Sequence, residues 1–301
     1  MDKIKNYFPL PETNCRVAVE IIQKSFKIEV EKTGIQKIVL GLSGGIDSAL
    51  VLYLAVAALG ENNIKAFYLP YKLSSPVSRK HAIMAANACN VSLIEKDISG
   101  AAEPLFNDMS VNEFSGNEQN PESNISENLI KLRKGNILAR LRMITLYDQS
   151  VLIPGLVAGT SNKTEILLGY STLWGDMASA VNPIGDLYKF QVRDISRYLK
   201  IPQEIIDKPP SADLWEGQTD EGELNLSYDL IDRILYHWID LGWNRARIES
   251  AAEKSGIDPE KINSVFQKVM KSQFKRKMPL IIKVSEKTID REFRYPRDWG
   301  L

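Results

Sequence analysis

Ser43-Gly44-Gly45-Ile46-Asp47-Ser48 places two adjacent glycines, two hydroxyls and one carboxylate within six residues. The glycines let the main chain turn sharply and approach a ligand closely, because they carry no Cβ. Such a turn directs several unpaired N–H groups, and the positive end of the helix that follows, at one point, which suits a phosphate. Asp47 adds a hard oxygen ligand that suits Mg²⁺ carried in by a nucleotide. The stretch therefore predicts a phosphate-binding loop.

Three known loop types compete for this interpretation. A Walker A loop requires Gly-Lys-Ser/Thr, and a dinucleotide fingerprint requires Gly-x-Gly-x-x-Gly; this stretch has neither the lysine nor that glycine spacing. Gly41-Leu42-Ser43-Gly44-Gly45 does match Gly-x-Ser-x-Gly, the nucleophile elbow of α/β-hydrolases. That elbow normally follows several earlier strands, whereas only a helix is expected before this one. A triad would also need His81 or His237, and His237 lies within a helical pattern.

The elements that position the loop follow an alternating order. A buried strand is predicted just before the loop and a helix just after it, closed by Gly60. Two more strands with a helix between them complete a βαβαβ pattern, which predicts an α/β fold with a doubly wound parallel sheet flanked by helices. Ligands of such sheets bind at the carboxyl ends of the strands, so Ser43 onwards and Pro70–Pro76 should line the site. The expected strands are Ile38–Leu40, Ile64–Leu69 and Val91–Ile94, and the helices Asn14–Lys32, Ala49–Leu59 and Ser78–Cys89.

The next part of the chain adds polar residues near that rim. A helix from about Leu129 to Tyr147 carries Asn136 and Arg140 four residues apart, hence on one face. Arg140 could grip a phosphate or carboxylate there, or belong to a solvated basic face. A strand is expected at Val151–Ala158, followed by Thr160 at its carboxyl end. Glu165, in the next helix, could be a surface charge or a ligand of the metal held by Asp47; its spacing does not decide. The later helices are expected from Lys189 to Leu199 and at Tyr228–Leu241, Arg245–Lys254 and Pro259–Gln273.

Composition excludes several classes of protein. The 301 residues are 44% hydrophobic and 25% charged, with 38 basic and 38 acidic residues. These values are typical of a globular chain and give no basic surplus for binding nucleic acid. Two cysteines do not form a disulfide framework, and two histidines argue against a His-based metal centre. Without a leader or an apolar run of membrane length, we expect a cytoplasmic protein with no membrane partner.

We expect one domain over residues 1–301, with two irregular segments. Residues 107–128 are rich in Asn, Glu, Ser and Gly, which predicts a mobile insertion. Residues 208–225 begin with Lys-Pro-Pro and are acidic, which fits a plain linker or a lid that orders over substrate.

The Ser-Gly-Gly-x-Asp-Ser loop resembles that of the N-type ATP pyrophosphatase (PP-loop) superfamily, whose members cleave ATP between the α- and β-phosphates. Further motifs narrow the resemblance to the NAD⁺ synthetase family over roughly Val17 to Pro296. They are Asn136-x-x-Ala139-Arg140-x-Arg142-Met143, Gly159-Thr160 with Glu165, Gly169-Tyr170-Ser171-Thr172, Gly175-Asp176, Pro183–Lys189 and Pro209–Leu214.

This resemblance implies an adenine nucleotide alpha hydrolase-like fold with C-terminal helices, and a ligase reaction. The nicotinate carboxylate of deamido-NAD⁺ would attack the α-phosphate of ATP, and ammonia would then displace AMP from the acyl-adenylate. Positioning, Mg²⁺ and N–H donors suffice for the first step, and no side-chain nucleophile is needed.

The resemblance also implies site residues. ATP would contact Gly41, Leu42, Ser43, Gly44, Gly45, Ile46, Asp47, Ser48, Thr160, Lys189 and Ser211, with Asp47 the catalytic residue. Asp47 and Glu165 would coordinate Mg²⁺. Deamido-NAD⁺ would contact Asn136, Arg140, Tyr170, Ser171, Thr172, Leu173 and Lys275.

Three departures bear on the dinucleotide contacts, since ammonia-dependent bacterial members often carry Lys, Asp and His where Leu173, Ala180 and Phe274 stand. The Tyr170–Leu173 turn is closer to the glutamine-dependent members, yet the sequence contains no nitrilase-like domain. The resemblance therefore implies free ammonia or a separate glutaminase as the nitrogen source, and a homodimer. Two alternatives stay open: another PP-loop adenylating amidotransferase, similar to GMP synthetase, and a nucleotide-binding sensor without turnover.

Overall fold

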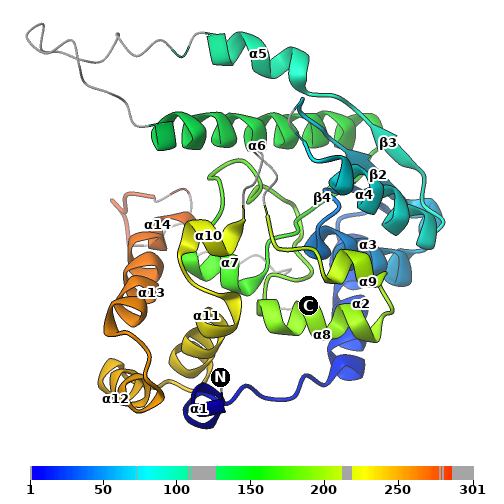
Figure 1. The fold of residues 1–301 in the computed structure, drawn as a ribbon. Helices are drawn as coiled ribbons and strands as arrows, with labels where there is room; N and C mark the ends of the chain where they lie inside the picture. Colours follow the sequence, from blue (N-terminus) through cyan, green and yellow to red (C-terminus); the bar gives the residue numbers. More distant parts are fainter. Residues whose placement is uncertain are drawn as a thin grey trace, which may run out of the picture.

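A sheet of parallel strands forms the centre of the chain (Figure 1). The computed structural model describes residues 2–72, 74–107, 109, 127–211, 219–277, 279 and 281–286. Among these, four strands pair in the order β3-β2-β1-β4 and every pairing is parallel, so the doubly wound α/β prediction is confirmed. The strands are β1 (Lys37–Gly41), β2 (Ile64–Tyr68), β3 (Leu93–Glu95) and β4 (Gly155–Ala158).

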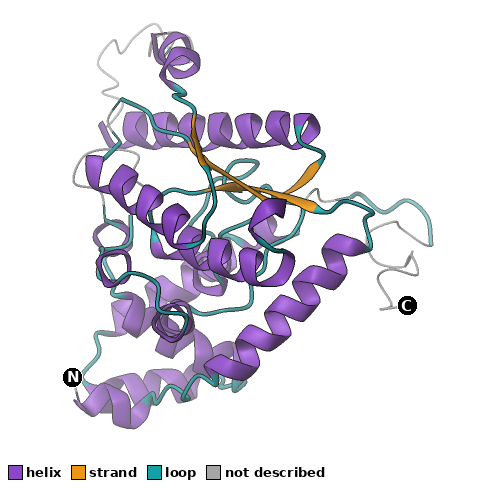
Figure 2. Ribbon diagram, turned by 90° about the vertical axis from the view of Figure 1, so that its right-hand side faces the viewer, coloured by secondary structure: helices purple, strands orange, loops and turns teal. Residues whose placement is uncertain are grey.

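Helices cover both faces of this sheet, as Figure 2 shows. Successive side chains of a strand point to opposite faces. Ile38 and Leu40 accordingly belong to the core shared with α2 (Cys15–Glu31) and α3 (Ile46–Leu59). Val39, between them, belongs to a smaller core on the other face together with Leu138 of the long helix α6 (Glu127–Leu152). Because β1 is central and apolar on both faces, its carboxyl end is a rigid platform for the loop that follows.

The helix after the loop begins three residues earlier than predicted. It starts at Ile46 rather than Ala49, so Asp47 and Ser48 lie in its first turn. Ser48 Oγ donates to the carbonyl of Gly45 at 3.0 Å, and Asp47 places a carboxylate near the positive end of the helix dipole. Both interactions favour an earlier helix start than apolar periodicity alone indicates.

The strand predicted at Val151–Ala158 begins late. Val151 and Leu152 end helix α6 instead, with 81% and 73% of their surface exposed, and β4 covers only Gly155–Ala158. Pro154 has no N–H with which to continue a helix, so it separates the two elements. The apolar run that begins at Val151 is compatible with a strand and with the end of a helix, because periodicity does not distinguish the two over so few residues.

A second core lies beside the sheet layers, formed by the C-terminal helices with α1. Its members include Phe8, Tyr228, Ile231 and Phe266. Helix α8 contacts both α3 and α11 and so connects the two cores.

The predicted helix Tyr228–Leu241 ends as a π-helical segment at Tyr236–Asp240. The remaining helices are α1 (Asp2–Tyr7), α4 (Pro76–Ala88), α5 (Ser99–Asn107), α7 (Lys163–Leu168), α8 (Lys189–Tyr198), α9 (Gln203–Ile206), α10 (Asp220–Leu224), α11 (Tyr228–Leu235), α12 (Arg245–Ser255), α13 (Pro259–Lys271) and α14 (Gln273–Arg276), with a 3₁₀ turn at Glu61–Asn63.

Both predicted irregular segments lie partly outside the described residues. Of the insertion at 107–128, residues 108 and 110–126 fall outside them, as do 212–218 of the predicted lid at 208–225. The single-domain, insertion and lid assignments therefore stay predictions. Within the described part of the chain, no helix is both long and apolar enough to cross a membrane.

Candidate active site

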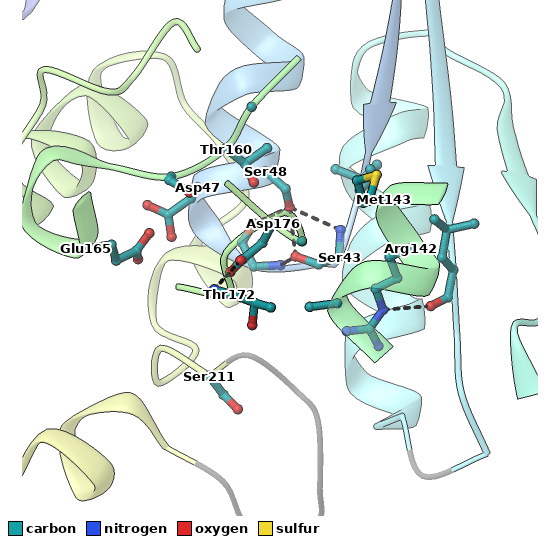
Figure 3. Close-up of a pocket in the computed structure, with 18 of the residues that line it drawn as sticks. Ser43, Asp47, Ser48, Arg142, Met143, Thr160, Glu165, Thr172, Asp176 and Ser211 are labelled. Atoms are coloured by element: carbon teal, nitrogen blue, oxygen red, sulfur yellow. Dashed lines mark hydrogen bonds between the residues drawn. The ribbon is translucent and has the colours of Figure 1, made fainter. Parts of the chain in front are cut away.

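The predicted phosphate loop is braced by its own two serines. Ser43 N donates to Ser48 Oγ at 3.2 Å, and the two hydroxyl oxygens lie 3.1 Å apart. Gly45 N donates to Ser43 Oγ at 3.3 Å. These bonds hold the turn between β1 and α3 in one shape. Ser43 is exposed and lines the pocket that opens over this turn (Figure 3).

Gly44 shows why this turn needs glycine. Its φ is +78°, a region that L side chains rarely adopt. A Cβ built on it would lie 2.1 Å from the carbonyl oxygen of Ser78, at the start of α4. The main chain of the loop is thus packed directly against another main chain, and only a hydrogen atom fits between them.

Gly44→Ala is expected to lower the free energy of unfolding by about 2–4 kcal/mol, since it combines backbone strain with a clash between main-chain atoms. Urea denaturation of the variant and the wild type measures the difference. Gly45→Ala is the matched control for folding, because its Cβ would meet only Ser43 Oγ, at an ordinary 3.4 Å. Equal stability of the two variants would contradict this account of Gly44.

A cavity of about 250 Å³ opens over the loop, at the carboxyl ends of β1, β2 and β4. This is where a doubly wound sheet is expected to bind its ligand. The structure brings most of the predicted site residues together here. Its lining includes Gly41, Leu42, Ser43, Gly45, Ile46, Asp47, Ser48, Thr160, Glu165, Tyr170, Thr172, Lys189 and Ser211.

Two carboxylates converge on one ammonium group at the edge of the cavity. Lys189 Nζ lies 2.6 Å from Asp47 Oδ2 and 3.3 Å from Glu165 Oε1, and its side chain is 1% exposed. Figure 3 shows the carboxylates of Asp47 and Glu165 facing each other. Asn162 caps α7 and donates its side-chain N–H to Asp47 Oδ1 at 3.0 Å. The α3 and α7 helix starts therefore aim their acidic residues at the same point.

Burial sets the protonation of this group. It raises the pKa of Glu165, with Lys189 opposing and Asp47 reinforcing the shift. Burial alone would lower the pKa of Lys189, but the attraction of Asp47 and Glu165 outweighs it, and the net pKa is raised. Lys189 therefore stays a cation between the two carboxylates.

The donor set fits a magnesium ion that arrives with a nucleotide. Asp47 and Glu165 both reach a single cationic position, and Mg²⁺ usually takes one or two carboxylates and completes its shell with phosphate oxygens and water. No cluster of three or more His, Cys, Asp or Glu side chains capable of holding a metal occurs among the described residues.

The predicted dinucleotide contacts are divided between the cavity and its supports. Tyr170 and Thr172 line the cavity. Thr172 Oγ1 donates to Asn136 Oδ1 at 2.8 Å, and Arg140 Nε donates to the carbonyl of Leu173 at 3.2 Å. Asn136 and Arg140 do share one helix face, and that face holds the Tyr170–Leu173 turn.

Lys275 supports the same turn from the other side. Its Nζ donates to the carbonyls of Gly169 and Ser171 at 2.8 and 2.7 Å. The Ser171 hydroxyl is buried with no hydrogen-bond partner among the described residues. Some predicted site residues are not part of the cavity lining: Gly44, Asn136, Arg140, Ser171, Leu173 and Lys275.

Sequence reasoning missed two carboxylates of the cavity. Asp220, 5% exposed, accepts from the hydroxyls of Tyr170 and Tyr228 at 3.2 and 3.1 Å. Asp176 accepts from Thr172 N at 2.6 Å, and burial raises its pKa, although solvent reaches it through the cavity. The sequence around Asp220 does not mark it as a site residue, because acidic residues are common in the first turn of a helix. Asp176 was part of a motif but carried no predicted role.

The far end of the cavity is apolar. Met143 and Leu146 of α6 line it, with Leu146 next to Gly41 at the end of β1, and Arg142 Nε donates to the carbonyl of Leu69 at 3.1 Å. An apolar wall with a few polar groups suits a planar base beside a phosphate-binding loop.

The hydrolase alternative has no geometric support. Ser43 Oγ has no hydrogen bond to a histidine among those of the described residues. His237 lies in the second core, where its ring packs against Phe8 and Trp243 and its Nδ1 contacts the carbonyl of Arg233.

Comparisons with known proteins agree with this geometry. The family model described as NAD synthase matches residues 18–279. An NH(3)-dependent NAD(+) synthetase from Trichlorobacter lovleyi is 48% identical over 90% of this chain and 92% of its own. The solved NH3-dependent NAD synthetase from Campylobacter jejuni is 30% identical with a TM-score of 0.70, covering 90% of this chain and all of its own. The NMN synthetase from Francisella tularensis is 28% identical with a TM-score of 0.73, covering 90% and 99%.

Proposed function

The chain belongs to the NAD synthase family, and from this premise we infer that it catalyses the ATP-dependent amidation of deamido-NAD⁺ to NAD⁺ with ammonia. It is therefore a ligase that forms a C–N bond. The observation that carries this inference is the cavity itself. One pocket holds the Ser43–Ser48 loop for phosphate, a converging carboxylate pair for a cation, and an apolar wall for a base.

The reaction has two steps. A carboxylate oxygen of the nicotinate attacks the α-phosphorus of ATP, the bond to the bridging oxygen breaks, and pyrophosphate leaves. Ammonia then attacks the acyl carbon of the adenylate, and the C–O bond breaks to release AMP, which keeps the carboxylate oxygen. One proton is lost as the amide forms. Adenylation is needed because a free carboxylate has no leaving group that ammonia can displace.

The loop residues and Lys189 bind the departing pyrophosphate. The main-chain N–H groups around Gly44 and Gly45 lie at the start of α3, where the helix dipole favours negative charge. Thr160 and Ser211, which both line the cavity, add hydroxyl donors for ATP (Figure 3). Asp47 and Glu165 would hold Mg²⁺, and the ion would supply positive charge to neutralise the phosphate oxygens.

The nicotinate end of the substrate lies along the Tyr170–Leu173 turn. The hydrogen bonds described above fix this turn, and they come from Asn136, Arg140 and Lys275. These three residues therefore act on the dinucleotide mainly by setting the shape of the turn. Leu173 is apolar, so recognition there is left to the main chain and to Thr172.

Asp176 has the properties needed to receive ammonia. Ammonium is the main form near neutral pH, and it must lose a proton before it can attack. Among the cavity carboxylates of the described residues, Asp47, Glu165 and Asp220 all act on Lys189, whereas Asp176 is acted on by Lys275. A carboxylate that lines the cavity and is open to solvent attracts a small cation and can accept its proton.

Asp176→Asn is therefore expected to slow NAD⁺ formation by about 100-fold at subsaturating ammonium, with ATP–pyrophosphate exchange nearly unchanged. Asparagine can keep the acceptor for Thr172 N but cannot bind a cation by charge or take its proton. Parallel measurement of exchange and of NAD⁺ by absorbance in a coupled dehydrogenase assay separates the two steps. An equal loss in both would place Asp176 in the first step instead.

We also propose that two copies associate through α6. Five large apolar residues on this helix are exposed: Leu129, Leu132, Ile144, Val151 and Leu152. Such a row along one helix is typical of a protein–protein interface. Sedimentation velocity at micromolar protein is expected to give a dimer mass for the wild type and a monomer mass for Val151→Glu.

The proposed activity is tested by incubating the protein with ATP, Mg²⁺, ammonium and a nicotinate substrate. We expect NAD⁺, AMP and pyrophosphate in equal amounts from deamido-NAD⁺. Similarity to the NMN synthetase makes nicotinate mononucleotide the second substrate to assay. Turnover of the mononucleotide alone would replace the dinucleotide proposal, and AMP formation with neither substrate would favour another carboxylate. ATP binding without any AMP would favour a sensor.

A further inference from the structure

Asp232 is a buried carboxylate that the proposed reaction does not use. It lies on α11, is 1% exposed, and has no direct contact with the cavity. Thr164 Oγ1 donates to its Oδ1 at 2.6 Å, and Phe190 N donates to its Oδ2 at 2.7 Å. Thr164 Oγ1 in turn accepts from Lys189 N at 3.0 Å. A continuous chain of hydrogen bonds thus runs from Asp232 to the main chain of Lys189.

These bonds fix the first turns of two helices that carry site residues. Lys189 and Phe190 open α8, and Thr164 precedes Glu165 in α7. The N–H groups in the first turn of a helix have no partner within it, so they are free to bind an outside acceptor. One carboxylate of α11 therefore sets where Lys189 and Glu165 stand relative to each other.

The same helix also contacts the Lys189 side chain. The ring of Tyr228, one turn before Asp232, lies 5.0 Å from Lys189 Nζ. Tyr228 further donates to Asp220, whose charge acts on Lys189. Helix α11 thus supports Lys189 at its main chain through Asp232 and at its ammonium through Tyr228.

Packing alone does not explain an acid at this position. Burial raises the pKa of Asp232 to about 6, which reflects the cost of an ionised group among Ile231, Ile234 and Leu235. An apolar residue here would leave the Thr164 hydroxyl and the Phe190 N–H without their acceptor, which costs stability. What an apolar residue cannot do is bind Thr164 and Phe190 N together.

We propose that Asp232 is a positioning residue that acts through Thr164 to hold Lys189 between Asp47 and Glu165, in register for the ATP phosphates. This rests on the proposed function, in which Lys189 meets the departing pyrophosphate. Asp232 touches neither substrate nor metal, and its main effect passes through the position of Lys189.

Asp232→Asn keeps the shape but satisfies only one of the two bonds, because an amide has one acceptor and one donor end. We expect the kcat for pyrophosphate release to fall about 10- to 100-fold, with the KM for deamido-NAD⁺ unchanged. Asp229→Asn, three residues earlier on the same helix, is the matched control. Its exposed carboxylate pairs with the buried Arg233, and neither residue lines the cavity, so the variant should retain wild-type kinetics.

Two substitutions at Thr164 provide a second test in case Asp232→Asn does not fold. Thr164→Val keeps the volume and removes the hydroxyl, whereas Thr164→Ser keeps the hydroxyl and removes a methyl group. Thr164→Ser should stay within about threefold of wild type, and Thr164→Val should repeat the loss seen in Asp232→Asn. A purely structural role would make both follow their melting temperatures.

A double-mutant cycle with Lys189→Met decides whether the effect passes through Lys189. The probe is the Mg²⁺ complex of α,β-methylene-ATP, with binding measured by titration calorimetry, which needs no turnover. Asp232→Asn should weaken binding about tenfold in the wild type and leave the Lys189→Met variant unchanged. Additive losses would overturn the proposal. If the wild type binds this probe yet makes no NAD⁺, the proposed function is wrong. The binding measurements of the cycle still test whether Asp232 acts through Lys189.

Discussion

Asp47→Asn is expected to lower pyrophosphate release from ATP by about a thousandfold, with the fold retained. Asp47 supplies one oxygen to Lys189 at 2.6 Å and another to Asn162 at 3.0 Å. Asparagine keeps one acceptor, but it turns an N–H group toward the Lys189 ammonium and removes the negative charge of a proposed metal ligand. The loss arises in the first step, because charge on the phosphate oxygens develops there.

The measurement is ATP–pyrophosphate exchange at saturating deamido-NAD⁺, together with a thermal melt. Asp194→Asn serves as the control, since Asp194 bonds Thr13 and Arg197 away from the cavity. We expect it to exchange at the wild-type rate. An Asp47→Asn protein that melts like the wild type and still exchanges at full rate would remove Asp47 from the mechanism.

Lys189→Met is expected to change two properties in opposite directions. Pyrophosphate release should fall by about 100- to 1,000-fold, because the loop loses its buried cation. Binding of Mn²⁺ without nucleotide should become about 10- to 100-fold tighter, because Asp47 and Glu165 then face each other with no positive charge between them. Electron paramagnetic resonance of free Mn²⁺ measures the second effect directly.

This pair of results distinguishes a local change from a general loss of structure. A misfolded protein would lose both activity and metal binding, whereas the arrangement of Asp47, Lys189 and Glu165 predicts that one falls as the other rises. Lys189→Arg keeps the charge and should leave Mn²⁺ binding weak, as in the wild type. Unchanged Mn²⁺ affinity in Lys189→Met would mean that the lysine does not compete for these carboxylates.

The parts of the site that could be predicted are those encoded in local sequence. The Ser43–Ser48 turn follows from its own glycines, and its place at the rim follows from the strand before it. The shared face of Asn136 and Arg140 likewise follows from helical spacing. The contacts of Asn136 and Arg140 could not be predicted, because the Tyr170–Leu173 turn that they bind lies more than thirty residues further along the chain.

Other features depend on contacts that only the folded chain creates. Asp220 enters the cavity because α10 packs beside Tyr170, and nothing in its neighbours along the chain indicates this. Asp232 did leave a signal. It stands between Ile231 and Arg233 with Tyr228 and Leu235 on the same helix face, so an acid lies where an apolar residue is expected. The end of α6 at Leu152 depended on Pro154 rather than on the apolar run before it.

The central claim is that the substrate carboxylate is adenylated before ammonia attacks. It is tested most directly with deamido-NAD⁺ whose carboxylate carries ¹⁸O, incubated with ATP, Mg²⁺, ammonium and the protein. Mass spectrometry of the products is expected to show one ¹⁸O in AMP and none in pyrophosphate. Label in pyrophosphate or orthophosphate, or AMP without label, would contradict the account.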